Sequence, residues 1–135
     1  MLTKPQLKKL EREAAKLADK LQIEKLKRFA AVEFPKLKEA YLGKAFKHTA
    51  GAGDTKVTTY FLVTKVEHNK GWTCADVTYV EFYRGKSGFV LYETTSTMWD
   101  NDGLFTGHTP ITFQEFDAEL QANLDRLAET WVKML

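Results

Sequence analysis

The chain has 135 residues, of which 44% are hydrophobic and 28% charged, and its formal net charge is +2. This length fits one domain, and the composition excludes a wholly disordered, collagen-like or low-complexity protein. A single cysteine, Cys74, excludes an intrachain disulfide framework. Neither a membrane-spanning run nor a signal peptide is recognisable, so we expect a cytoplasmic protein with no membrane partner.

Charge is distributed unevenly along the chain. Residues 1–48 carry 13 Lys and Arg against 6 Asp and Glu, whereas residues 49–135 carry 7 against 12. One interpretation is that the positive helix face lies against the acidic carboxyl-terminal segment. The alternative is a nucleic-acid-binding protein whose basic arm contacts phosphates through Lys4, Lys8, Lys9, Arg12, Lys16 and Lys20.

The first segment predicts a long helix. Thr3 and Gln6 have the spacing of a capping box, and Pro5 falls in the first turn, where its missing N–H costs nothing. Such a helix is longer than a domain of this size can cover. We therefore expect residues 1–34 to form a coiled-coil-like arm for homo-oligomerisation, unless the helix instead wraps its own core. The heptad-spaced stripe consists of Leu7, Leu10, Ala14, Leu17 and Leu21.

Beyond Leu21 the apolar register slips. A second stripe, rotated from the first, is expected to pack on the body of the same chain; it consists of Ile23, Leu26, Phe29, Ala30 and Phe34. Pro35 is expected to end or kink the helix, because its ring disfavours helical geometry at the preceding residue. Lys36 to Tyr41 could continue for one more turn.

The middle of the chain predicts an antiparallel meander. Runs of β-branched and aromatic residues alternate with glycine-containing turns. Strands are expected at residues 43–49, 57–67, 72–83 and 89–97, with a short fifth strand at Pro110–Ile111. Four strands of this length usually curl, so we expect either a small SH3-like or OB-like barrel or a curled sheet covered by helices.

The last segment predicts a second amphipathic helix. Thr112 and Glu115 repeat the capping-box spacing. The fold class is therefore α+β: a long amino-terminal helix, a small antiparallel barrel or curled sheet, and a carboxyl-terminal helix, with residues 35–135 forming one folding unit. The stripe expected to face the core consists of Phe113, Phe116, Leu120, Leu124, Leu127 and Trp131.

No catalytic constellation is recognisable, so we expect a non-enzymatic protein without metal or cofactor. Gly85–Gly88 contains the tail of a phosphate-binding motif, but a strand is expected after it where such a loop needs a helix. Asp100–Gly103 resembles part of a calcium loop, but Met98 and Thr109 would then occupy ligand positions that require acids. Cys74 on a strand fits a small core residue.

Aromatic side chains outnumber what a small core can hide. The loop from Trp99 to Pro110 is long, and long ordered loops often carry function, although Trp99 and Phe105 could equally plug an open barrel end. We expect a surface for a host protein or a small anionic, nucleotide-like ligand, with a subunit interface as the natural pocket for a nucleotide. The candidate ligand-binding residues are Lys44, Lys47, Tyr60, Tyr92, Trp99, Phe105 and His108.

Two short motifs flank the expected meander: Tyr41–Lys47 (YLGKAFK) and Ile111–Phe116 (ITFQEF). With a helical arm before them and an aromatic-rich strand between them, they resemble a pattern in small phage and prophage proteins, over the whole chain in order of elements. The resemblance implies an accessory protein that counters a host defence by binding, and it attaches no catalytic residues.

Overall fold

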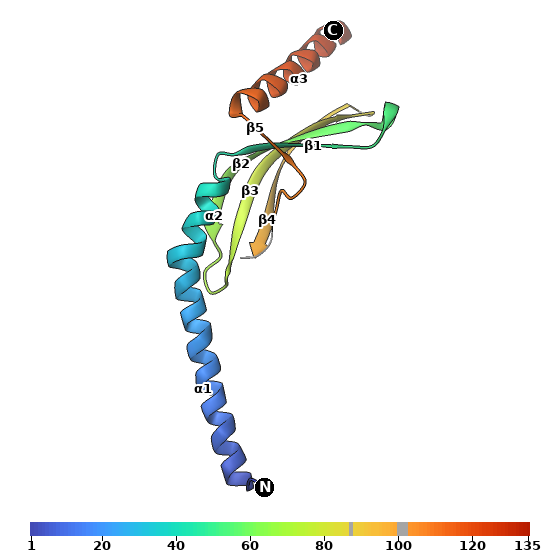
Figure 1. Ribbon diagram of the computed structural model, residues 1–135. Helices are drawn as coiled ribbons and strands as arrows, with labels where there is room; N and C mark the ends of the chain where they lie inside the picture. Colours follow the sequence, from blue (N-terminus) through green and yellow to red (C-terminus); the bar gives the residue numbers. More distant parts are fainter. Residues whose placement is uncertain (87, 100–102) are drawn as a thin grey trace.

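A computed structural model describes residues 1–86, 88–99 and 103–135. The chain forms a long amino-terminal helical arm, a five-stranded antiparallel sheet and a carboxyl-terminal helix, which confirms the α+β class (Figure 1). Ser87 of the Gly85–Gly88 turn and residues 100–102 of the calcium-like segment lie outside the described residues.

Helix α1 (Lys4–Arg28) begins as the sequence predicts. Thr3 Oγ1 accepts the Gln6 N–H at 3.4 Å, and the Thr3 N–H donates to Gln6 Oε1 at 2.8 Å. This reciprocal pair satisfies amide groups that the first helical turn leaves without partners. The helix is about 37 Å long at 1.5 Å per residue and projects away from the rest of the molecule (Figure 1).

Pro35 does not end the helix, so that alternative is wrong, whereas the expected continuation to Tyr41 is confirmed. A π-helical segment (Phe29–Glu33) follows α1 directly, and α2 (Phe34–Tyr41) continues through the proline. A proline lacks the N–H of an α-helical bond and its ring crowds the carbonyl four residues earlier. The wider π-turn, closed by the Phe34 N–H to the Phe29 carbonyl, lies just before the proline and gives the backbone room for it.

The π segment is where the arm meets the body. Phe29 is 1% exposed, and its ring centroid lies 5.0 Å from that of His68 and 6.4 Å from that of Phe34. Only part of the second predicted stripe packs in this way, since Ile23 and Ala30 remain exposed.

The sheet has the strand order β4-β3-β2-β1-β5. Its strands are β1 (Ala45–Ala50), β2 (Val57–His68), β3 (Cys74–Gly85), β4 (Gly88–Trp99) and β5 (Thr109–Ile111), and a short 3₁₀ turn (Gly53–Thr55) links the first two. The long strands β2, β3 and β4 form the predicted meander. Because β4 and β5 are the two edges of this order, the sheet is open, and the curled-sheet alternative holds in place of the closed barrel.

Each face of the sheet carries its own apolar cluster. On one face α2 and the segment around Phe105 cover the cluster formed by Phe61, Val63, Val66, Ala75, Val77, Met98 and Phe105. On the other face α3 (Phe113–Met134) covers a smaller cluster formed by Ala45, Phe82 and Phe116. Cys74 is 1% exposed, as expected of a core residue.

Only the first half of α3 packs on the sheet. Phe116 is 2% exposed and its ring centroid lies 5.2 Å from that of Phe82, whereas Leu127 and Trp131 are 40% and 60% exposed. The prediction of a core-facing stripe along the whole helix is therefore wrong, also for Phe113. The helix is about 33 Å long. Its first half lies over β1 and β2 and reaches β3, where Arg84 Nε donates to Asn123 Oδ1 at 3.0 Å, before the helix extends past the sheet (Figure 1).

Candidate functional site

The amino-terminal arm carries an exposed apolar surface. No residue of α1 is buried. Leu7, Leu10, Leu17 and Leu21 are 45%, 49%, 68% and 56% exposed. Monomeric proteins rarely leave a contiguous apolar stripe of this length in water. We call this stripe the leucine seam; it comprises Leu7, Leu10, Ala14, Leu17 and Leu21.

Cations gather on the opposite side of the same helix. At 100° per residue, a row of four cations with three- and four-residue spacing falls on the side of α1 opposite the leucine seam. We call this row the basic stripe; it comprises Lys9, Arg12, Lys16 and Lys20. Over the described part of the chain, the ion pairs of α1 lie at its carboxyl-terminal end, where Lys27 pairs with Glu24 at 3.6 Å and Arg28 with Glu33 at 3.3 Å.

The basic arm does not lie against the acidic carboxyl-terminal helix of its own chain. The two helices project from opposite ends of the molecule (Figure 1). The intramolecular interpretation of the charge asymmetry is therefore wrong, because the sheet and α2 separate α1 from α3.

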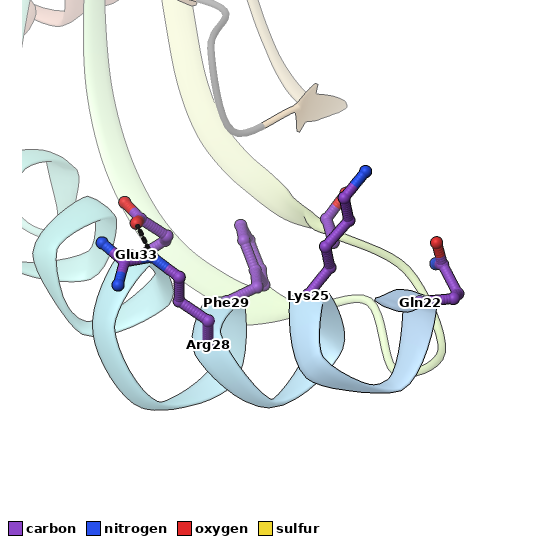
Figure 2. A pocket seen from close by; sticks show the side chains of 6 residues that line it. Gln22, Lys25, Arg28, Phe29 and Glu33 are labelled. Atoms are coloured by element: carbon purple, nitrogen blue, oxygen red, sulfur yellow. Dashed lines mark ion pairs between the residues drawn. The ribbon is translucent and has the colours of Figure 1, made fainter. Parts of the chain in front are cut away.

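A hollow of about 370 Å³ lies where α1 reaches the body (Figure 2). Phe29 forms its apolar wall, and Arg28 is held at its edge by Glu33. Sequence reasoning missed this hollow, because Thr73 reaches it from the β2–β3 connection, far from α1 in sequence. Its lining residues are Gln22, Lys25, Arg28, Phe29, Glu33 and Thr73.

Two of the predicted ligand residues, Lys47 and Tyr60, lie side by side under α3. They face each other across β1 and β2. Lys47 Nζ lies 3.1 Å from Glu115 Oε1, and this hydrogen bond raises the pKa of Lys47. Burial raises the pKa of Tyr60, whose ring stacks on Phe82 at 5.0 Å. The Lys47 charge is thus already paired with the Glu115 carboxylate in the first turn of α3. Lys44, just before β1, is exposed.

Phe105 and His108 meet on the other face of the sheet. Phe105 is 7% exposed and stacks on Phe46 with a centroid distance of 4.5 Å. The His108 ring lies 5.5 Å from Phe105 and 4.7 Å from His48. Phe105 therefore belongs to the core cluster that α2 also covers.

Tyr92 and Trp99 lie on the edge strand β4. The Tyr92 hydroxyl forms a hydrogen bond with Glu81, which together with burial and the Glu81 charge raises the pKa of Tyr92 to about 12. Glu81 is only 8% exposed and also accepts from Thr94 Oγ1 at 3.2 Å. Trp99 is 43% exposed and meets Trp72 edge-on at 6.2 Å.

The seven predicted ligand residues therefore do not form one site within a single chain. The register places Tyr60 opposite Phe82, and Phe82 opposite Leu91, so Tyr60 and Tyr92 point to opposite faces of the sheet. A ligand that touches both would need residues from two copies.

Among the described residues, no group of three or more His, Cys, Asp or Glu side chains is placed to hold a metal ion. Within the same ranges, no helix is both long and apolar enough to cross a membrane. The chain matches no protein-family model, no curated protein and no solved structure.

Proposed function

We propose that this protein is a non-enzymatic binding protein that self-associates through the leucine seam. The observation that carries the proposal is the exposure of four seam leucines on a helix with no buried residue. Full burial of one leucine contributes about 1.5–3 kcal/mol. Four half-exposed leucines per copy thus supply several kcal/mol to an interface between copies.

Sedimentation velocity at tens of micromolar tests this proposal. The wild type is expected to sediment as an oligomer, and Leu10→Lys with Leu17→Lys as a folded monomer, because both leucines are exposed on a helix with no buried residue. Lys9→Gln with Lys16→Gln, on the opposite side of the same helix, is the matched control and is expected to remain oligomeric. A wild type that is monomeric at this concentration contradicts the proposal.

We further propose a phage-type accessory or anti-defence role, in which the assembled protein binds a host protein or a small nucleotide-like ligand. The support is the resemblance carried by YLGKAFK and ITFQEF, together with the exposure of Lys44, Tyr92 and Trp99. Because these residues are far apart in one chain, an interface between copies is the place for such a ligand.

Equilibrium binding of a panel of adenine and guanine nucleotides tests the ligand part of this role. The wild type is expected to bind one member of the panel. Lys44→Ala is expected to weaken that binding, and Lys56→Ala, an exposed lysine outside the predicted set, is expected to preserve it. Absence of binding across the panel at millimolar nucleotide removes the nucleotide interpretation and leaves the host protein as partner.

The basic stripe favours a second candidate, a nucleic-acid-binding protein. Its four cations share one side of an exposed helix, and the leucine seam on the other side leaves them accessible after self-association. Each phosphate contact with duplex DNA adds about 0.9 to the slope of log affinity against log salt. Lys9→Gln with Lys16→Gln is therefore expected to reduce that slope by about 2 per copy. Absence of DNA and RNA binding at low salt contradicts this candidate.

A further inference from the structure

The outer half of α3 is a second unpartnered apolar surface. The stripe that begins on the sheet at Phe116 and Leu120 continues with helical spacing after the helix has left the sheet. Trp131 and Met134 are 60% and 75% exposed. We call this continuation the outer α3 surface; it comprises Leu124, Leu127, Trp131 and Met134.

The outer α3 surface and the leucine seam complement each other in shape. The seam has a small residue, Ala14, at its centre, and Ala18 lies beside it, so a recess is expected between Leu10 and Leu17. Trp131 is a large exposed ring of the kind that anchors protein interfaces by filling such a recess. Two seams packed in register would instead bring the two Ala14 positions together, without a large side chain to fill the recess.

The two helices also complement each other in net charge. α1 carries nine Lys and Arg against four Asp and Glu, whereas α3 carries two against five. Packing α1 on α1 brings together two helices with the same excess charge, while packing α1 on α3 brings together opposite ones.

The positions of the helices allow such a contact only between different copies. α1 and α3 project from opposite ends of the molecule (Figure 1). When two copies lie side by side in antiparallel orientation, each arm lies beside the α3 helix of the other copy. A two-fold arrangement of this kind closes on itself and forms the contact twice. Because the contact forms twice, the total buried area is twice that of one contact, and a standard stable interface buries roughly 1,600 Å² in total.

We propose that the leucine seam of one copy packs on the outer α3 surface of a second copy, and reciprocally. This inference rests on the proposed self-association and names the surface that receives the seam. It gives a binding partner to the outer half of α3, which extends past the sheet.

Cysteine cross-linking between two separately purified variants tests the pairing. Ala14→Cys places a thiol at the centre of the seam, Ala128→Cys places one beside the outer α3 surface, and both positions are exposed. Under mild oxidation, the mixture is expected to form a disulfide between the two variants. Glu129→Cys, on the far side of α3, replaces Ala128→Cys in the matched control and is expected to form none. Cys74 is buried and takes no part.

The outcomes separate the inference from the proposal on which it rests. A wild type that sediments as a monomer overturns both. An oligomeric wild type in which Ala14→Cys cross-links mainly to itself, or in which the mixture forms no disulfide, overturns the inference alone. Trp131→Ala is expected to raise the dissociation constant by on the order of thirtyfold for each of the two reciprocal contacts, whereas Val132→Ala, off the stripe, is expected to leave it unchanged. A Trp131→Ala variant that associates like the wild type also overturns the inference.

Discussion

Replacement of Phe105 by alanine decides whether the ring is a core plug or a ligand contact. Phe105 is 7% exposed, stacks on Phe46 at 4.5 Å and meets Phe61 edge-on at 5.6 Å. Removal of a buried phenylalanine side chain costs about 3–5 kcal/mol, because transfer energy is lost and a cavity remains. A domain of this kind is stable by only about 5–15 kcal/mol, so the variant is expected to lose a large share of its stability.

Urea denaturation followed by circular dichroism measures this loss. The midpoint is expected to fall with an unchanged denaturant slope, since the fold is weakened but not altered. Trp99→Ala is the matched control: it removes a larger ring, but one that is 43% exposed, and it is expected to cost about 1 kcal/mol. A Phe105→Ala variant that is less than about 1 kcal/mol weaker than the wild type refutes the assignment of the ring to the core.

Four further predictions concern single groups. Thr112→Ala is expected to cost about 1 kcal/mol through the lost helix cap. Lys47→Met is expected to change the urea midpoint by no more than the equivalent of about 1 kcal/mol, because its ion pair is only half-buried and remains in contact with water. The folded state raises the pKa of Tyr92, so the contribution of this group to the free energy of unfolding is expected to be complete below pH 10 and to be lost as pH rises towards 12. Tyr92→Phe is expected to remove this pH dependence. Urea denaturation at several alkaline pH values measures it. Burial raises the pKa of Cys74, so its thiol is expected to react slowly with a disulfide reagent at neutral pH until the protein is unfolded, as absorbance of the released thiolate reports.

Local signals in the sequence predict the elements well. Thr3 and Gln6 form their capping box because both partners lie within one helical turn. Thr112 and Glu115 have the same spacing, and Thr112 does cap α3, with the Glu115 N–H donating to its Oγ1 at 3.0 Å. The Glu115 carboxylate, however, pairs with Lys47, which is 68 positions away. Spacing within one turn cannot reveal a competing partner brought close by the tertiary fold.

Apolar periodicity reports that a helix is amphipathic but not what covers it. Phe116 and Trp131 belong to one stripe with regular spacing, yet the first is buried and the second is exposed, because α3 extends past the end of the sheet. The same limit applies to Pro35, which the sequence marks as a helix breaker. The adjacent π-turn that accommodates the proline leaves no local signature in the sequence.

The candidate ligand residues illustrate a limit of a different kind. Each of Tyr60 and Tyr92 is correctly placed on a strand, but the face to which each points depends on register. Strand register depends on turn geometry and pairing, so a shift of one residue would exchange the two faces. Lys47 and Tyr60 come together because β1 and β2 are neighbours, while Tyr92 is separated from them by the thickness of the sheet.

The opposite placement of the leucine seam and the basic stripe makes one variant informative about both candidate functions. Leu10→Lys with Leu17→Lys adds two positive charges to α1 and also removes the proposed oligomer. If the arm binds nucleic acid as a monomer, the added charges are expected to strengthen binding and steepen its salt dependence. If binding relies on arms from two copies, the loss of the second arm removes half of the phosphate contacts. Duplex DNA affinity measured across salt concentrations is then expected to fall, with a shallower slope, despite the added charge. Stronger binding by this variant would therefore show that self-association is not needed for nucleic-acid binding.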